Sequence, residues 1–211
     1  MRSMTVRVGA AVLALGMIVS TVACSTGWVN EALQIVSALT PAVTNIVPLI
    51  ALADKNVPMS DVTTIQNYSN QASTALQTVG SLITQFDQAQ SLQAQQDVLS
   101  KIESALAVAQ QNLNAILPQL HIANPRSQAA VEAAVAAAIS EVGSIAALLP
   151  VLKAGKTAQA VELAKPINAR TFRSRYNHAI KPVPGSDKLK LHGPSFLGSL
   201  GNALGEAFVS R

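Results

Sequence analysis

Cys24 is the only cysteine in this 211-residue chain, and its thiol is the strongest nucleophile the sequence offers. It stands in the stretch IVSTVACSTGW, residues 18–28, just past the end of an apolar run. Because a lone cysteine cannot form a disulfide within its own chain, four roles are open to it. These are a free thiol, an intermolecular disulfide, a buried apolar side chain and a site of covalent modification.

The other residue types that commonly carry catalysis are scattered along the chain. His121, His178 and His192 lie far apart, and no close pair of histidine or cysteine residues has the spacing of a metal site. No glycine-rich phosphate loop follows a predicted strand, and the nucleophile motif Gly-x-Ser-x-Gly does not occur. We therefore predict no enzyme, no metal or other cofactor and no small-molecule substrate.

The residues before Cys24 have the layout of a secretory signal peptide. Arg2 and Arg7 give a basic start, and an apolar stretch of about twelve residues follows, too short to span a bilayer comfortably. The four residues that end at the cysteine, Thr21-Val22-Ala23-Cys24, resemble the lipobox of bacterial lipoproteins, with Thr21 where leucine is commonest. The resemblance covers only the first 24 residues and identifies no family for the rest of the chain.

The lipoprotein resemblance implies a covalent anchor on Cys24. Residues 1–23 would be removed as the signal peptide, the thiol would carry a diacylglyceryl group, and the new amino terminus would be acylated. Two or three acyl chains hold a protein stably at a membrane, because each buried methylene contributes about 0.8 kcal/mol. The resemblance also implies export to the cell envelope. Ser25, a residue other than aspartate after the cysteine, points to the outer membrane facing the periplasm if the cell is Gram-negative.

The composition favours helices and divides the chain by charge. Hydrophobic residues make up 49% of the chain, aromatic residues 3% and charged residues 12%, against a usual charged share of about a quarter. Residues 24–150 carry eight acidic and three basic side chains, whereas residues 151–211 carry three acidic and ten basic ones. The chain thus has an acidic body and a basic tail. Export would keep the basic tail away from nucleic acid, which we exclude as a partner.

Residues 60–150 repeat apolar side chains at alternating spacings of three and four, as in helices with one apolar face. We predict helices over about 60–88, 91–119 and 125–149, with Ser60 and Asn124 as N-caps. The junction at 87–91 contains neither glycine nor proline, so both a bent pair of helices and one long rod remain open. The three apolar stripes are Val62, Ile65, Ser69, Ala72, Leu76, Val79, Ile83 and Phe86; Leu99, Ile102, Leu106, Ala109, Leu113, Ile116 and Leu120; and Val131, Val135, Ala138, Val142, Ile145 and Leu149.

Residues 24–59 form an apolar N-terminal helical segment with proline kinks. Residues 35–53 carry no charge and are long enough to cross a hydrocarbon core. We predict that Thr40-Pro41 breaks or restarts the helix and that Pro48 kinks it. The favoured hypothesis is a buried helix pair or kinked helix that completes a four-helix bundle. Insertion into the membrane and contact with another copy are the alternatives.

Residues 151–211 form a basic tail rich in proline and glycine. Their few apolar clusters predict an extended or disordered segment, followed by a short amphipathic helix at residues 195–208. Six cations, interleaved with two aromatic residues, are candidates for contact with an anionic surface, although a solvated linker is the favoured interpretation. The six are Arg170, Arg173, Arg175, Lys181, Lys188 and Lys190.

Taken together, these patterns predict an all-α protein: an elongated three- or four-helix bundle of antiparallel, coiled-coil-like helices with a flexible basic C-terminal tail. The expected function is that of a lipid-anchored envelope protein with a structural, adaptor or interaction role. Its heptad faces would bind a protein partner or a second copy of the chain. The alternative is a protein that inserts into or remodels membranes through residues 35–53 and 195–208.

Overall fold

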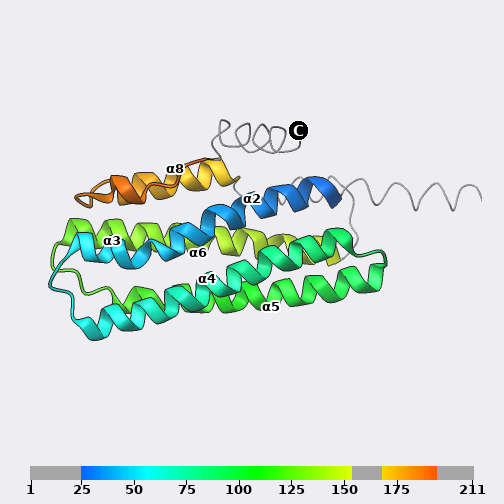
Figure 1. Cartoon of the computed structure of the whole chain (residues 1–211), viewed down its shortest axis with the longest axis horizontal. Coiled ribbons are helices and arrows are strands. Elements are labelled where there is room, and N and C mark those ends of the chain that lie inside the picture. The colour runs from blue at the N-terminus through cyan, green and yellow to red at the C-terminus, as the bar shows by residue number, and fades with distance from the viewer. Residues whose placement is uncertain (1–24, 154–167, 194–211) are drawn as a thin grey trace, which may run out of the picture.

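Helices account for most of the part of the chain that the structure describes, residues 25–153 and 168–193 of a computed structural model. The long helices lie side by side along one axis (Figure 1), and the described residues contain no strand. This confirms the prediction of an all-α bundle. The elements are α2 (Ser25–Thr44), α3 (Ile46–Ala53), α4 (Met59–Gln88), α5 (Leu92–Ile116), the 3₁₀ helix η1 (Leu117–Gln119), α6 (Pro125–Lys153), α8 (Ala169–Ile180) and the 3₁₀ helix η2 (Ser186–Leu189).

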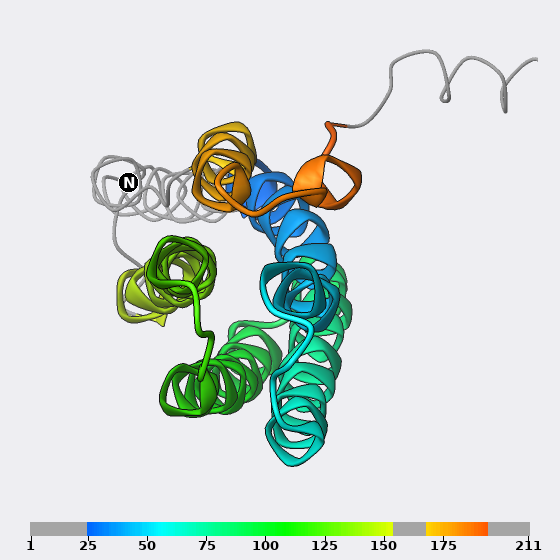
Figure 2. The same ribbon diagram turned by 90° about the vertical axis from the view of Figure 1, so that its left-hand side faces the viewer.

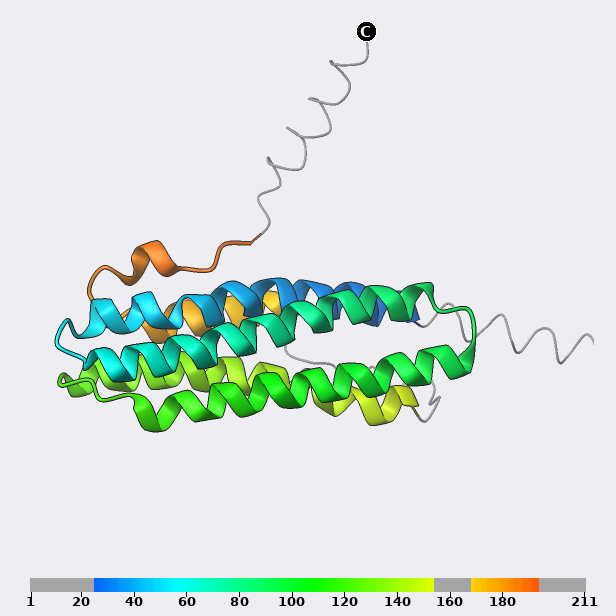
Figure 3. The same ribbon diagram turned by 60° about the horizontal axis from the view of Figure 1, so that its bottom comes forward.

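Helices α4 and α5 form an antiparallel hairpin, so the chain bends at residues 89–91 and does not continue as a rod (Figure 3). Ala89 ends α4 in an extended conformation with a ψ of 121°. Ser91 then caps α5, because its hydroxyl accepts a hydrogen bond from the backbone N–H of Ala94 at 3.2 Å. A serine cap thus makes the break without glycine or proline.

The helices close into a ring around a shared core (Figure 2). Helix α2 packs against α4, α4 against α5, α5 against α6, α6 against α8, and α8 against α2. One contiguous apolar cluster runs through all of them. At the end where α2 begins, Trp28 and Phe86 meet edge to face, with ring centroids 5.4 Å apart.

The three predicted apolar stripes form much of this core. Every stripe residue is buried except Val62, which is half-buried. The stripe of α6 contains three valines and one alanine, and these small side chains allow its neighbours to approach closely. Since the stripes are covered within one chain, only the outer faces of the helices remain for a partner.

Local capping agrees with the sequence at one of the two predicted positions. The side chain of Asn124 accepts hydrogen bonds from the backbone N–H groups of Arg126 and Ser127 at 2.9 and 3.1 Å, which confirms the cap of α6. The prediction for Ser60 is wrong. Helix α4 already begins at Met59, and the Ser60 hydroxyl donates to the side chain of Asp61 at 3.2 Å.

Pro41 does not break the N-terminal helix, which corrects the prediction made from Thr40-Pro41. Helix α2 runs through Pro41 to Thr44, and the boundary with α3 falls at Asn45. Backbone bonds from Asn45 N to Pro41 O and from Leu49 N to Asn45 O span this boundary at 3.0 and 2.9 Å. The two helices therefore continue one another as a kinked pair, in agreement with the favoured hypothesis.

Two helical stretches, Trp28–Ala53 and Pro125–Ala147, are long and apolar enough to cross a membrane by length and composition alone. The 18-residue window that meets this test in each stretch has 50% and 44% of its residues, respectively, buried inside the bundle. Core helices of soluble proteins pass the same test, so the apolar character of residues 35–53 has an explanation within the bundle.

The extended tail expected after residue 150 is wrong for residues 168–193. Helix α6 continues to Lys153, and α8 and η2 lie against α6, α2 and α3. Phe172, Tyr176 and Ile180 recur every four residues along α8 and are 0–1% exposed. Three large apolar side chains on one face of this basic helix bury enough surface to hold it against the bundle. The predicted helix at 195–208 lies outside the described residues.

Candidate functional site

The fold distributes the six predicted cations over one side of the bundle. Arg170, Arg173 and Arg175 belong to α8, Lys181 follows its C-terminus, and Lys188 and Lys190 belong to η2 and its C-cap. Their surroundings differ. Arg173 and Lys190 are half-buried, whereas the other four are exposed. The structure thus brings two of the six together in a sheltered place. Cys24, the predicted lipid site, lies outside the described residues.

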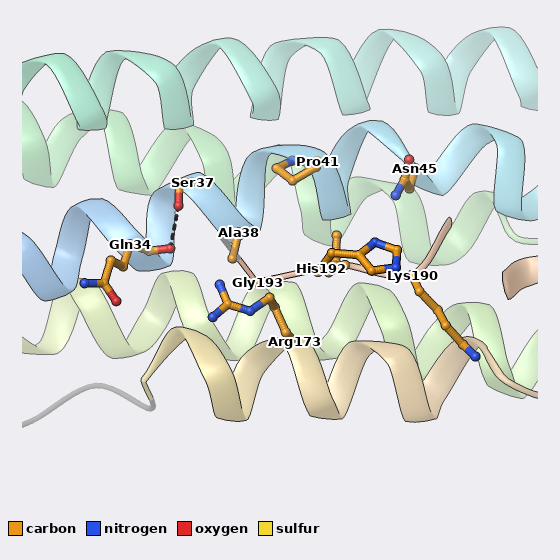
Figure 4. Close-up of a pocket in the computed structure, with 10 residues that line it drawn as sticks. Gln34, Ser37, Ala38, Pro41, Asn45, Arg173, Lys190, His192 and Gly193 are labelled. Atoms are coloured by element: carbon orange, nitrogen blue, oxygen red, sulfur yellow. Dashed lines mark hydrogen bonds between the residues drawn. The ribbon is translucent and has the colours of Figure 1, made fainter. Parts of the chain in front are cut away.

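Arg173 and Lys190 line a pocket of about 450 Å³ between α2, α8 and the segment 190–193 (Figure 4). The guanidinium of Arg173 extends from α8 toward α2, near Ala38 and Gly193, and the His192 ring lies near Asn45. The volume falls within the range of small-molecule sites. The remaining lining residues are Gln34, Ser37, Pro41 and Leu191.

Two asparagine side chains fix the wall formed by residues 189–193. Asn177 on α8 donates from Nδ2 to the carbonyl of Leu191 at 2.9 Å, and its Oδ1 accepts from the Leu191 N–H at 2.7 Å. Asn45 donates from Nδ2 to the carbonyl of Leu189 at 3.1 Å. These bonds satisfy backbone groups that no helix or strand pairs, so the segment is held at a set distance from α2 and α8.

The two cations of the pocket differ in how much positive charge they offer a ligand. The Lys190 ammonium pairs with Asp187 at 2.6 Å and points away from Arg173 (Figure 4). That bond, the Lys190 charge and the nearby Lys181 charge together lower the pKa of Asp187. Arg173 has no carboxylate partner within the described ranges 25–153 and 168–193. The guanidinium is therefore the main uncompensated charge facing the pocket.

A buried tyrosine lies near Asn45, one of the lining residues of the pocket. Tyr176 is 1% exposed, and burial raises the pKa of its hydroxyl to about 12. The Asn45 side chain opposes this shift, although no hydrogen bond of normal geometry joins the two side chains. The hydroxyl thus stands without a hydrogen-bond partner among the described residues.

Glu141 on α6, one of the eight acidic residues of the body, is a second buried group. Its side chain is 1% exposed, and its Oε1 has no hydrogen-bond partner within the described part of the chain. Burial raises the pKa of Glu141 to about 7, the Arg175 charge opposes that shift and the Glu31 charge adds to it. The sequence spacing could have predicted this burial, since Glu141 lies three residues after Ala138 and four before Ile145, both on the predicted apolar stripe.

Sequence reasoning also missed Asn45, Asn177 and His192 as parts of the site. They come from three separate stretches, and nothing in their local spacing links them. Among the described residues, no group of three or more His, Cys, Asp or Glu side chains is placed to hold a metal ion.

The fold and the pocket define the class of protein as an all-α helical bundle with a pocket of mixed polar and apolar lining between α2 and α8. The chain matches no protein-family model, no curated protein and no solved structure. Its function therefore has to be argued from its own residues.

Proposed function

We propose that this protein is a lipid-anchored helical component of the bacterial cell envelope that acts by binding other molecules. The signal-peptide layout and the sequence Thr21-Val22-Ala23-Cys24 support the anchor. The observation that carries the proposal is that α2, the first described helix of the bundle, begins at Ser25, the residue that follows Cys24 in the sequence.

A lipid on Cys24 would be joined to the bundle without a long linker, because α2 starts at the next residue. Trp28, 5% exposed, is the first described core residue, and it lies three residues after the start of α2. Three residues of helix span roughly 5 Å. A lipid on Cys24 would hold this end of the bundle close to the membrane surface, with the Trp28–Phe86 contact anchoring α2 in the core.

The outer surfaces of the bundle support an interaction role. The side formed by α8 and the described residues after it carries the six cations and one acidic side chain, Asp187. The excess of positive charge favours anionic partners. On α4 and α5, a hollow of about 560 Å³ is lined mostly by small uncharged side chains around Val108, which is 47% exposed. Lys101 is the one charged residue in its lining. Contact with a protein partner or a second copy would use such outer faces.

Replacing Cys24 by alanine is expected to abolish lipid labelling and release the protein from membranes. Bacterial cells expressing the wild type or Cys24→Ala would be labelled with a palmitate analogue and fractionated. Because the anchor is the acyl chains, the variant should lose the label and appear in the soluble fraction with wild-type helical circular dichroism. Ser25→Ala, one residue further on, is the matched control and should keep both label and membrane association.

The same fractionation separates the proposal from membrane insertion. A protein inserted through residues 35–53 and 195–208 would stay with membranes and need detergent even without the lipid. Retention of unlabelled Cys24→Ala in the membrane fraction would therefore contradict anchoring by lipid alone. Labelling of the alanine variant would show that the lipid is attached elsewhere.

A further inference from the structure

We infer that the pocket between α2, α8 and residues 190–193 binds a small organic phosphate, with the Arg173 guanidinium as the group that receives the phosphate. This goes beyond the proposed anchoring and holds whether or not Cys24 carries lipid. The pocket is built by the fold, since α2 and α8 are core helices and Asn45 and Asn177 pin its third wall.

The chemistry of the lining favours an anion. Arg173 presents a planar donor fork that matches two oxygens of a phosphate or carboxylate, and it has no carboxylate partner in the described ranges. On the other side of the pocket, a ring nitrogen of the His192 imidazole can donate a second hydrogen bond to the ligand. Donors approaching from two directions suit a tetrahedral phosphate better than a flat carboxylate.

The remaining lining leaves space for an organic group. A pocket of about 450 Å³ is larger than a phosphate ion needs, and Ala38, Pro41 and Leu191 add apolar surface to it. The side-chain amide of Gln34 and the hydroxyl of Ser37 add polar atoms. The Ser37 hydroxyl already donates to the backbone carbonyl of Gln34 at 2.8 Å, so the Ser37 oxygen remains free to accept a hydrogen bond from the ligand. A short polyol carrying one phosphate, such as glycerol phosphate, matches this mixture.

Gly193 keeps the approach to Arg173 open. A β-carbon built at residue 193 would lie 3.8 Å from Nη2 of Arg173, already in van der Waals contact. A larger side chain there would occupy the space in front of the guanidinium. Gly193→Val thus blocks the site without removing its charge, and the backbone of Gly193 does not require a positive φ.

The test is calorimetric titration of the mature chain, in a neutral detergent, with glycerol 3-phosphate and with uncharged glycerol. Arg173→Gln should weaken phosphate binding roughly ten- to a hundred-fold, the range expected for a charged bidentate contact. Gly193→Val should weaken it as well. Arg126→Gln, which removes the same charge from an exposed site on α6 outside the pocket and outside the six cations, should leave it within about two-fold. Unchanged urea midpoints would show that the variants are folded.

A second arm distinguishes a free phosphate from a lipid headgroup. Vesicles of phosphatidylglycerol and of phosphatidylcholine would be sedimented with the Cys24→Ala chain carrying either arginine substitution. Loss of phosphatidylglycerol binding in Arg173→Gln but not in Arg126→Gln supports the pocket with a lipid headgroup as its ligand. The same pattern seen with glycerol 3-phosphate alone supports a soluble ligand. No binding in either arm, equal losses in the two arginine variants, or equal binding of glycerol would overturn the inference.

Discussion

Replacing Glu141 by glutamine is expected to raise the free energy of unfolding at pH 8 by about 3 kcal/mol, and by less than about 1 kcal/mol at pH 5. The folded-state pKa of Glu141 is raised to about 7 from an ordinary value of 4.5. Between these values the folded protein keeps a proton that the unfolded chain releases. The stability of the wild type should therefore fall as pH rises from about 4.5 to 7 and stay lower above pH 7. An amide does not titrate, so it removes this loss.

The measurement is urea unfolding of both proteins at intervals from pH 5 to pH 8. Glu132→Gln on the same helix is the control, since Glu132 is half-buried and accepts a hydrogen bond from Gln128 at 2.8 Å. That variant still contains Glu141 and should keep the pH dependence of the wild type. If the free energy of unfolding of Glu141→Gln falls as much between pH 5 and pH 8 as that of the wild type, the result contradicts the burial of this carboxyl group.

Replacing Phe172 by alanine is expected to cost about 3–5 kcal/mol and to undock α8. The ring is 1% exposed and lies 6.3 Å, centroid to centroid, from Tyr176, which is also buried. Removing it leaves a cavity between α8 and its neighbours α6 and α2. Amide hydrogen exchange across residues 169–180 should accelerate strongly, and the urea midpoint should fall.

Two further substitutions on α8 separate packing from other effects. Arg170→Ala removes an exposed side chain and should leave exchange unchanged. Tyr176→Phe removes a buried hydroxyl that has no hydrogen-bond partner within the described ranges, so it should be neutral or slightly stabilising. A solvated tail would give the opposite pattern for Phe172→Ala, with no change in the free energy of unfolding and no protected amides in the wild type.

The helices α4, α5 and α6 were predictable because each carries one apolar face whose period appears in the sequence. Helix α8 was not, because its composition between Asn168 and Pro184 is that of a solvated segment. Its docking depends on three large side chains that find a surface only after the other helices have assembled. The N-cap Asn168, which accepts from the Thr171 N–H at 2.9 Å, and the four-residue spacing from Phe172 to Ile180 were the available signals.

The site was predictable in its residue types and not in its arrangement. The sequence identified Arg173 and Lys190 among six cations, but only the fold separates them from Arg175, whose charge acts on Glu141. The pairing of Lys190 with Asp187, three residues earlier, lies within reach of sequence reasoning. Asn45 and Leu189, 144 residues apart, could be joined only by the assembled bundle.

The intact mass of the native chain, purified from the membranes of the cell that makes it, tests the proposed anchor most directly. We expect a chain that starts at Cys24, lacks residues 1–23, and is heavier than its sequence by a diacylglyceryl group and an amide-linked acyl chain. A mass that fits an unmodified thiol, or one that still includes residues 1–23, would contradict the proposed anchoring.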